Sequence, residues 1–298
     1  MKRGVLIAIL IVVVFVIILA LLGGFVYLQL HQEPHVPDNA FLKINLSGKI
    51  VDNNESVGSP VISVRDLFYH IKRAKMDKRI KGIILNISGI CSGFSKIEDI
   101  GLMITDFKKS GKKVYSFIEA GGLKDYYMST YGDEVYVLKG WDLFLKGLAS
   151  EAIFIKTTLS KLGIQAEMYH VGEYKTASNM FTKNEMTPEH RESLETLLGD
   201  IYHSVLTGIA TRRNIKMEVL IDILEQSPLN NKYYLKAGLI DKTMYEDEIL
   251  KNKKTKYQTI NFNTYKETSS PKPFKGSKKI AVIFASGEIH LGKSTSGD

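Results

Sequence analysis

The chain has 298 residues, a formal net charge of +8 and a single cysteine, Cys91. One cysteine excludes an intramolecular disulfide, so the fold must rely on its hydrophobic core. The lysines are scattered apart from two denser runs, at 72–81 and 251–256, and no aromatic-interleaved basic motif accompanies them. We therefore expect no nucleic-acid partner. Such runs suit anionic lipid, but solvated helix faces and a linker are the simpler interpretation.

An uncharged apolar segment runs from Val5 to Leu28, directly after Lys2 and Arg3. A helix needs about 20 residues to cross a bilayer, and this segment exceeds the apolar region of a cleaved signal peptide. Residues 29–42 contain no Lys or Arg, so the positive-inside rule places residues 1–4 in the cytoplasm and the body outside. We expect a single-pass anchor at 5–28 in the cell inner or plasma membrane, held by membrane lipid, with an extracytoplasmic or periplasmic body.

Strands and helices alternate along the body, after a polar stalk at 29–40. Hydrophobic periodicity predicts strands at 41–51, 81–87, 112–118, 134–138 and 166–171. It predicts helices at 61–79, 96–110, 124–131 and 149–162, and a long helix with Thr187 as N-cap and Pro188 in its first turn. This alternation is typical of βαβ units, so we expect an α/β fold with a largely parallel sheet covered by helices.

The C-terminal part of the chain changes in composition. Residues 251–277 are polar and basic and are interpreted as a linker that follows a domain spanning 41–250. A new apolar strand follows, and Ala285-Ser-Gly-Glu-Ile289 repeats the pattern of Leu46-Ser-Gly-Lys-Ile50. Repeats indicate duplicated architecture. We interpret 278–298 as the start of a second repeat that is cut off at Asp298.

One lysine stands out as a candidate for chemistry. Lys175 lies among small and polar residues, in the segment 172–178 after a predicted strand. In a semi-buried site the pKa of such a lysine falls, and the neutral amine acts as a general base or Schiff-base nucleophile; the alternative is a surface lysine in a loop. Ser178 is too close in sequence to leave room for a substrate. The seven histidines show no metal-ligand spacing. The turns at Ser88-Gly89 and Ser92-Gly93 are candidates for offering backbone N–H groups to an anion, but plain turns are the simpler interpretation.

The surroundings of this lysine resemble a known family. The stretch His170–Phe181, followed by Asn184–Glu192, is similar to signal peptide peptidase A, the protease IV family of membrane-bound serine peptidases. In that family a Gly-x-Tyr-Lys-Ser/Thr-Ala motif, then a Phe and Met-Thr/Ser-Pro-x-x-Arg-Glu, surrounds the catalytic lysine. Further matches are Lys81-Gly-Ile-Ile-Leu, Gly111-Lys-Lys-Val, Tyr126-Tyr127 and Ala237-Gly-Leu-Ile-Asp241.

The resemblance implies a long form built from two crotonase/ClpP-like halves, with the lysine in the first and a nucleophilic serine in the second. It implies that Lys175 is the general base, with Thr176 or nearby polar groups orienting its amine. It also implies hydrophobic peptide substrates such as cleaved signal peptides, a homo-oligomer, and neither cofactor nor metal.

This chain departs from the family's serine motif. Second halves of the family read Ala-Ser-Gly-Gly-Tyr-Tyr, whereas this chain reads Gly122-Leu-Lys-Asp-Tyr-Tyr127 and has Leu123 where the serine would be needed. We therefore expect it to supply the base and lack the nucleophile. Two other classes stay open: a noncatalytic membrane-tethered scaffold or binding module, and a crotonase-like acyl-CoA enzyme, which would need neither the anchor nor Lys175.

Overall fold

The computed structural model describes residues 4, 13–24, 34–53, 61–226, 230–251, 255–269, 271–274, 276 and 280–283. Residues 13–24 are helical and lie within the predicted anchor, whose remaining residues fall outside the described part of the chain. Among the described residues, no helix combines the length and the apolar character needed to cross a membrane. Of the predicted second repeat at 278–298, only 280–283 are described, without regular secondary structure.

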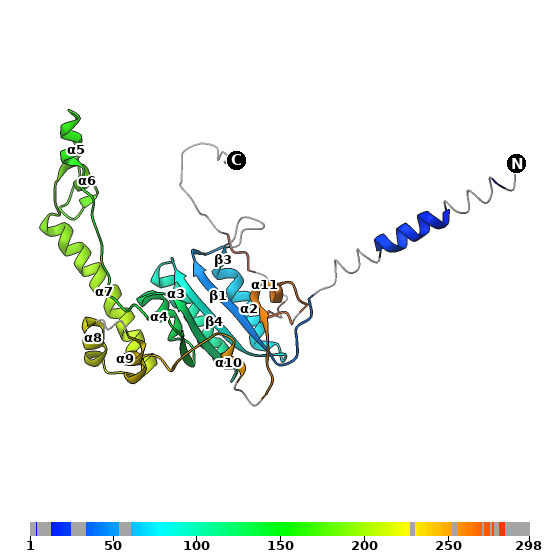
Figure 1. Ribbon diagram of the computed structural model, residues 1–298. Coiled ribbons are helices and arrows are strands. Elements are labelled where there is room, and N and C mark those ends of the chain that lie inside the picture. The colour runs from blue at the N-terminus through cyan, green and yellow to red at the C-terminus, as the bar shows by residue number, and fades with distance from the viewer. Residues whose placement is uncertain are drawn as a thin grey trace.

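Six parallel strands form the main sheet, in the order β7-β6-β5-β4-β1-β8 (Figure 1). They are β1 (Ala40–Gly48), β4 (Ile80–Ile90), β5 (Lys113–Ala120), β6 (Glu134–Leu138), β7 (Lys242–Met244) and β8 (Gln258–Asn261). A separate pair consists of β2 (Ile50–Val51) and β3 (Ile62–Ser63). Six of the eleven residues of β4 form an uninterrupted buried run, as expected for a strand covered on both faces. The predicted parallel α/β architecture is thereby confirmed.

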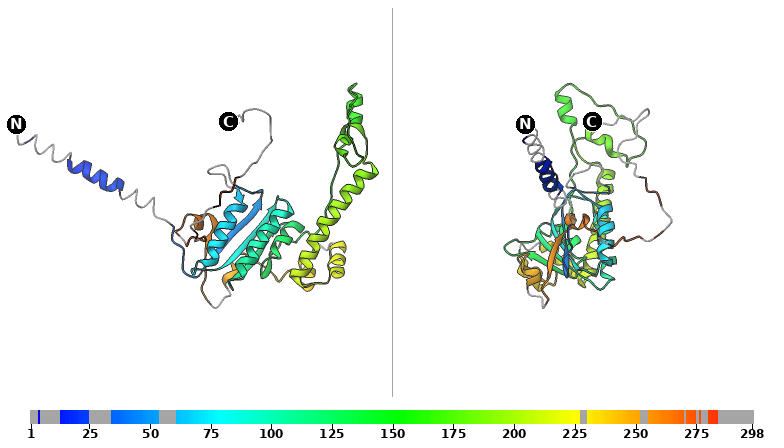
Figure 2. Two further views of the ribbon diagram at one scale, coloured as in Figure 1. Left: turned by 180° about the vertical axis from the view of Figure 1, so that it is seen from behind. Right: turned by 90° about the vertical axis from the view of Figure 1, so that its right-hand side faces the viewer.

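Helices cover the sheet and extend away from it. In chain order they are α2 (Val64–Met76), α3 (Phe94–Lys108), α4 (Leu123–Ser129), α5 (Lys156–Lys161), the 3₁₀ turn η1 (Thr176–Ser178), α6 (Asn179–Thr182), α7 (Pro188–Arg213), α8 (Met217–Gln226), α9 (Asn231–Lys236), α10 (Glu248–Lys251) and α11 (Phe262–Lys266). Buried residues of α2, α3, α4, α8 and the C-terminal part of α7 join one large core cluster with the sheet (Figure 2). A smaller cluster on β1, β4, β5, β6 and β7 is covered by Ile249 of α10.

A glycine lets an aromatic ring cross the central strand on that smaller face. Phe41 on β1 stacks against Tyr115 on β5 with ring centroids 5.6 Å apart, although β4 lies between these strands. A Cβ atom at Gly82 of β4 would collide with the Phe41 ring and with the carbonyl of Lys113. The glycine of the Lys81-Gly-Ile-Ile-Leu motif is therefore required by packing.

The segment interpreted as a linker contributes to the folded body. β8 pairs with β1, and Phe262 and Tyr265 of α11 are buried. Arg73 of α2 donates hydrogen bonds from Nη2 to the carbonyl oxygens of Tyr265 at 2.8 Å and Thr268 at 3.0 Å. The body therefore extends past residue 250, because short polar strands such as β8 give little periodic signal in the sequence.

The expected stalk also packs on the body in its described part. Of residues 34–40, Val36 is fully buried in the large core cluster. The backbone N–H of Ala40 donates to the carbonyl of Arg79 at 2.9 Å, which fixes the chain at the start of β1. The interpretation of 29–40 as a stalk is therefore wrong for its last residues.

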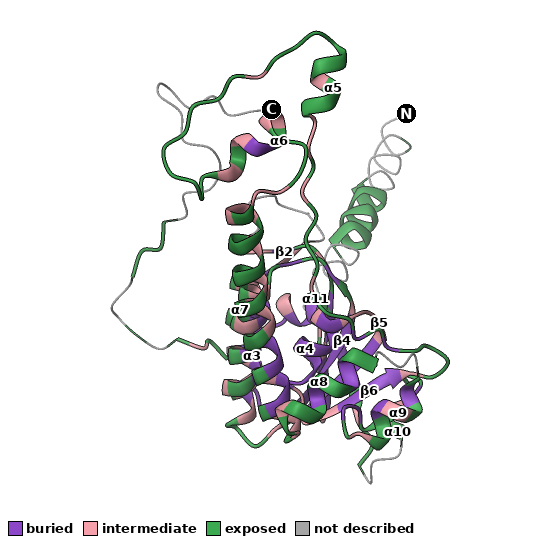
Figure 3. Ribbon diagram, turned by 90° about the vertical axis from the view of Figure 1, so that its left-hand side faces the viewer, coloured by how far each residue is buried: buried purple, intermediate pink, exposed green. Residues whose placement is uncertain are grey.

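An arm made of α5, η1, α6 and the first half of α7 projects from the body (Figures 1 and 3). The predicted N-cap of α7 is confirmed, since the Thr187 hydroxyl accepts a hydrogen bond from the His190 N–H at 3.3 Å. The predicted strand at 166–171 is wrong: 166–170 are irregular and 171 lies in a bend, with all but one of the six exposed. The helix predicted at 149–162 is limited to α5. These predictions fail because no strand among the described residues pairs with this segment.

Candidate functional site

Lys175 lies on the arm, between α5 and α6, at the start of η1. The turn that presents it depends on Gly172, whose φ of +96° is a conformation that side chains with a Cβ rarely adopt. The backbone N–H of Lys175 donates to the carbonyl of Gly172 at 3.3 Å and closes this turn. The glycine of the lysine motif is thus explained by backbone conformation, since no atom lies within 4 Å of its Cβ position.

The Lys175 side chain is exposed, as in the alternative of a surface lysine in a loop. Its Nζ has no hydrogen-bond or ion-pair partner among the described residues, and Thr176 makes no side-chain hydrogen bond to it there. The desolvation that a neutral lysine requires is therefore not supplied by this part of the chain. A second surface has to cover the arm before Lys175 reaches a buried setting.

The two parts of the lysine motif are held together across the arm. The hydroxyl of Tyr174 donates to Oε2 of Glu192 on α7 at 2.8 Å, and this bond raises the pKa of the tyrosine. The ring of Phe154, which lies outside both motif segments, meets His190 edge-on with centroids 6.2 Å apart. The Tyr174–Glu192 hydrogen bond thus connects the segment that presents the lysine to the first turns of α7.

Ser178 does not offer a nucleophile in this arrangement. Its Oγ is buried and has no hydrogen-bond partner among the described residues. An oxygen that attacks a peptide carbonyl must be accessible to the substrate, and this oxygen is not. The structure therefore agrees with the expectation that the nucleophile is not the local neighbour of Lys175.

The position expected for a serine is filled by a buried leucine at the start of α4. Leu123 is 5% exposed and packs in the large core cluster. Two residues later, the buried carboxylate of Asp125 accepts hydrogen bonds from the N–H of Ile90 at 2.8 Å and of Gly122 at 3.0 Å. The carboxylate thus takes the place that an incoming anion would occupy between these two backbone N–H donors. We call the two donors with the Asp125 carboxylate between them the self-filled cradle.

Further backbone N–H groups around the end of β4 donate hydrogen bonds within the protein. The Ser92 hydroxyl accepts from the N–H of Ile50 at 2.7 Å, and the N–H of Cys91 donates to the carbonyl of Gly48 at 2.8 Å. With the N–H of Ile90 held by Asp125, these groups are committed to structure. The N–H groups of Ile90 and Cys91, which lie between the Ser88-Gly89 and Ser92-Gly93 turns, are therefore not available to an anion.

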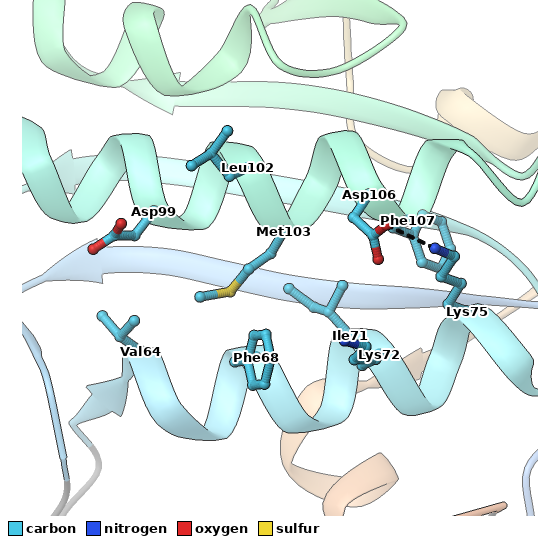
Figure 4. A pocket seen from close by; sticks show the side chains of 10 residues that line it. All are labelled: Val64, Phe68, Ile71, Lys72, Lys75, Asp99, Leu102, Met103, Asp106 and Phe107. Atoms are coloured by element: carbon cyan, nitrogen blue, oxygen red, sulfur yellow. Dashed lines mark hydrogen bonds and ion pairs between the residues drawn. The ribbon is translucent and has the colours of Figure 1, made fainter. Parts of the chain in front are cut away.

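The chain does not bring Lys175 and the degenerate serine position together. Lys175 lies beside α6 at the far part of the arm, whereas Leu123 begins α4 in the body, as both views agree (Figures 1 and 2). A separate apolar pocket of about 320 Å³ lies between α2 and α3, where Lys75 and Asp106 form an ion pair at 2.8 Å (Figure 4). None of the residues lining that pocket belongs to the lysine motif, and we assign it no part in the chemistry.

Comparison with known proteins finds relatives that are named as proteases. Residues 106–270 match the model of peptidase family S49, and this range includes the whole lysine motif. The chain is 30% identical to the chloroplastic serine protease SPPA of Arabidopsis thaliana, over 85% of this chain and 39% of that protein. It is 26% identical to Protease 4 of Salmonella typhi, over 95% of this chain and 51% of that protein. The chain therefore spans about half or less of the length of these relatives.

Among solved structures, the chain is similar to a monofunctional enoyl CoA isomerase from M. smegmatis, at 12% identity and a TM-score of 0.35. The match covers 67% of this chain and 73% of that chain. That likeness is too low to support any conclusion. The α/β assignment rests on the parallel sheet itself, and the family assignment rests on the sequence match over residues 106–270. The chain belongs to peptidase family S49, the group to which the signal peptide peptidase A resemblance pointed.

Proposed function

We propose that this chain is the lysine-bearing half of a membrane-anchored Ser/Lys peptidase that degrades hydrophobic peptides such as cleaved signal peptides. The observation that carries the proposal is the match to family S49 over a range that contains Lys175 and its bracing segment. The names of the relatives, a serine protease and Protease 4, support peptide hydrolysis as the reaction.

In the proposed mechanism a serine from a second half attacks the peptide carbonyl. The neutral amine of Lys175 accepts the serine proton, passes it to the leaving amine, and then helps water to attack the acyl-enzyme. Backbone N–H groups beside that serine stabilise the oxyanion. General-base assistance of this kind contributes on the order of 10²–10⁴-fold to the rate.

The exposed arm supports a homo-oligomer or a tightly associated second half as part of this mechanism. Apolar side chains on the arm are open to solvent, among them Ile153, Tyr169 and Leu197, with exposed fractions of 69%, 95% and 56%. Covering them removes apolar surface from water, which favours association. The same covering surface would desolvate Lys175 and lower its pKa toward the range in which the amine is neutral.

The proposed topology places residues 1–4 in the cytoplasm, the segment 5–28 in the bilayer and the body outside. Its support is the apolar length of that segment together with the basic residues before it. Protease added to the cytoplasmic side of sealed vesicles should leave the body intact. Digestion of the body from that side would contradict the topology.

The assignment of roles is tested by hydrolysis of a fluorogenic hydrophobic signal-sequence peptide. With Leu123 at the serine position, the purified 298-residue chain should hydrolyse it no faster than its Lys175→Ala variant. A fluorophosphonate probe, which labels activated serines, should leave the chain unlabelled. Hydrolysis by the chain that Lys175→Ala abolishes would overturn the assignment of the nucleophile to a second half.

A noncatalytic, membrane-tethered scaffold remains the second candidate. It is favoured by the buried Leu123 and by the cradle that Asp125 fills, since neither residue supplies a serine hydroxyl at the position where the family's nucleophile is expected. An NMR titration discriminates between the two candidates in the assembled protein. A pKa of Lys175 near 10.4, the ordinary lysine value, would favour the scaffold.

A further inference from the structure

Four lysines from two parts of the sequence meet at one pocket of the folded body. Lysines 78, 81, 112 and 113 line a pocket of about 680 Å³ together with Thr255 and Tyr257, which precede β8. The lysines lie at the amino ends of β4 and β5, the end of the sheet opposite to Leu123 and Asp125. None of the described residues that line the pocket is acidic.

Among the residues that the structure describes, none of the four lysines of this pocket forms an ion pair with an acid. Lys112 donates from Nζ to the carbonyl oxygens of Ala74 at 2.7 Å and Asp77 at 2.8 Å, so it is held by dipoles at the end of α2. The carboxylate of Asp77 is buried and forms an ion pair with Arg79 at 2.8 Å. Burial lowers the pKa of Lys112 to about 8, against the raising effect of Asp77 and with a smaller lowering effect of Lys81.

Aromatic side chains form the apolar part of the same pocket. Phe41, Tyr115 and Tyr257 line it, and the rings of Phe41 and Tyr257 meet edge-on with centroids 5.0 Å apart. Tyrosine beside lysine is the combination found where proteins meet the headgroup region of a bilayer. The pocket therefore suits an anion attached to an apolar body.

The chain enters the body at this end of the sheet. Asn39 accepts a hydrogen bond at its carbonyl from the N–H of Gln258 at 3.3 Å, one residue from the pocket-lining Tyr257. Val36 is fully buried and fixes the chain to the body at this point. Only eight peptide units separate it from Leu28, a reach of at most about 29 Å. A segment held in the bilayer up to Leu28 thus keeps this end of the body close to the membrane surface.

We propose that the pocket lined by Lys78, Lys81, Lys112 and Lys113 binds the phosphate headgroups of anionic phospholipids in the membrane that holds the N-terminal segment. The proposal rests on the anchor of the proposed function but not on peptidase activity. Lipid contact here would orient the body, with the carboxyl ends of the strands turned away from the bilayer. Each lysine at an anionic surface strengthens the contact on the order of fivefold.

The test uses the full chain reconstituted in nanodiscs of phosphatidylcholine, with or without phosphatidylglycerol. Acetylation of individual lysines is followed by mass spectrometry. Lys78, Lys81 and Lys113 should react several-fold more slowly in the phosphatidylglycerol discs, and high salt should remove the difference. Lys139 and Lys161, exposed residues away from the pocket, should react equally in both discs.

A charge-reversal pair provides the matched control. The double variant Lys78→Glu/Lys81→Glu should abolish the protection of Lys113, whereas Lys139→Glu/Lys161→Glu should preserve it. If acetylation is equal in both discs while carbonate extraction shows that the chain is still embedded, lipid binding by the pocket is refuted and the membrane anchor is not. If carbonate releases the chain from the membrane, the anchor is refuted. If inorganic phosphate protects the lysines equally well in phosphatidylcholine discs, the proposal that the ligand is a lipid is refuted.

Discussion

Removing the carboxylate of Asp125 should lower the stability of the body, because two backbone N–H groups lose their hydrogen-bond acceptor. Asp125 is 5% exposed, and its oxygens accept from the N–H groups of Ile90 and Gly122 at 2.8 and 3.0 Å. These bonds connect the loop after β4 to the first turn of α4. The Asp125→Ala variant leaves the buried N–H of Ile90 and the half-buried N–H of Gly122 without an acceptor, and Asp125→Asn keeps one acceptor and loses the charge.

The expected size follows from the number of donors left unpaired. A buried donor without a partner costs about 1–3 kcal/mol, so Asp125→Ala should lower the free energy of unfolding by about 2–5 kcal/mol. Asp125→Asn loses one of the two bonds and should lower it by about 1–3 kcal/mol. Asp99→Asn, an exposed acid on α3, is the matched control and should stay within about 0.5 kcal/mol of the parent.

The assay is urea unfolding of the full chain in mild detergent, combined with amide hydrogen exchange. The exchange of Ile90 and Gly122 should accelerate in both Asp125 variants, because these amides lose the acceptor itself. A stability of Asp125→Ala equal to that of the Asp99 control, with unchanged exchange at the two amides, would refute the self-filled cradle.

Two further variants test the body of the fold. Gly82→Ala should lower the free energy of unfolding by about 1–3 kcal/mol, because the new Cβ atom collides with the Phe41 ring. The control Gly147→Ala adds its Cβ in open space and should leave the stability unchanged. Equal urea midpoints for the two variants would contradict this. Burial and the charge of Arg73 lower the pKa of His70 to about 4 from 6.5. The folded state then binds fewer protons between these values, so the melting temperature should fall as pH drops from about 6.5 to about 4. His70→Gln should flatten that slope, and an unchanged slope would exclude His70 as its source.

The alternating part of the body could be predicted because its pattern is strongly periodic. The strands and helices between residues 40 and 138 appear in the predicted order, since buried parallel strands give continuous apolar runs. β7 and β8 were missed, because strands of three and four residues carry little pattern: in β8 only Ile260 is buried. Short edge strands owe their conformation to the neighbour that pairs with them.

In the arm, the local sequence does not predict the secondary structure or the exposure of the residues. Residues 166–171 were predicted as a strand, yet Tyr169 is 95% exposed and no strand in the described part of the chain pairs with this segment. Lys175 was identified by its motif, whereas its exposure depends on which surfaces pack against the arm. The role of Asp125 left no signal in a single sequence, because a buried carboxylate cannot be told from a surface one without its partners.

The central claim is that Lys175 is the general base of a peptidase completed by a second half. The most direct measurement compares the product of the whole gene with its Lys175→Ala variant in hydrolysis of a hydrophobic signal peptide, with Lys161→Ala as control. The account predicts that Lys175→Ala lowers kcat by about 10²–10⁴-fold or more with little change in KM, and that Lys161→Ala has no effect. A Lys175→Ala enzyme with undiminished kcat would contradict it.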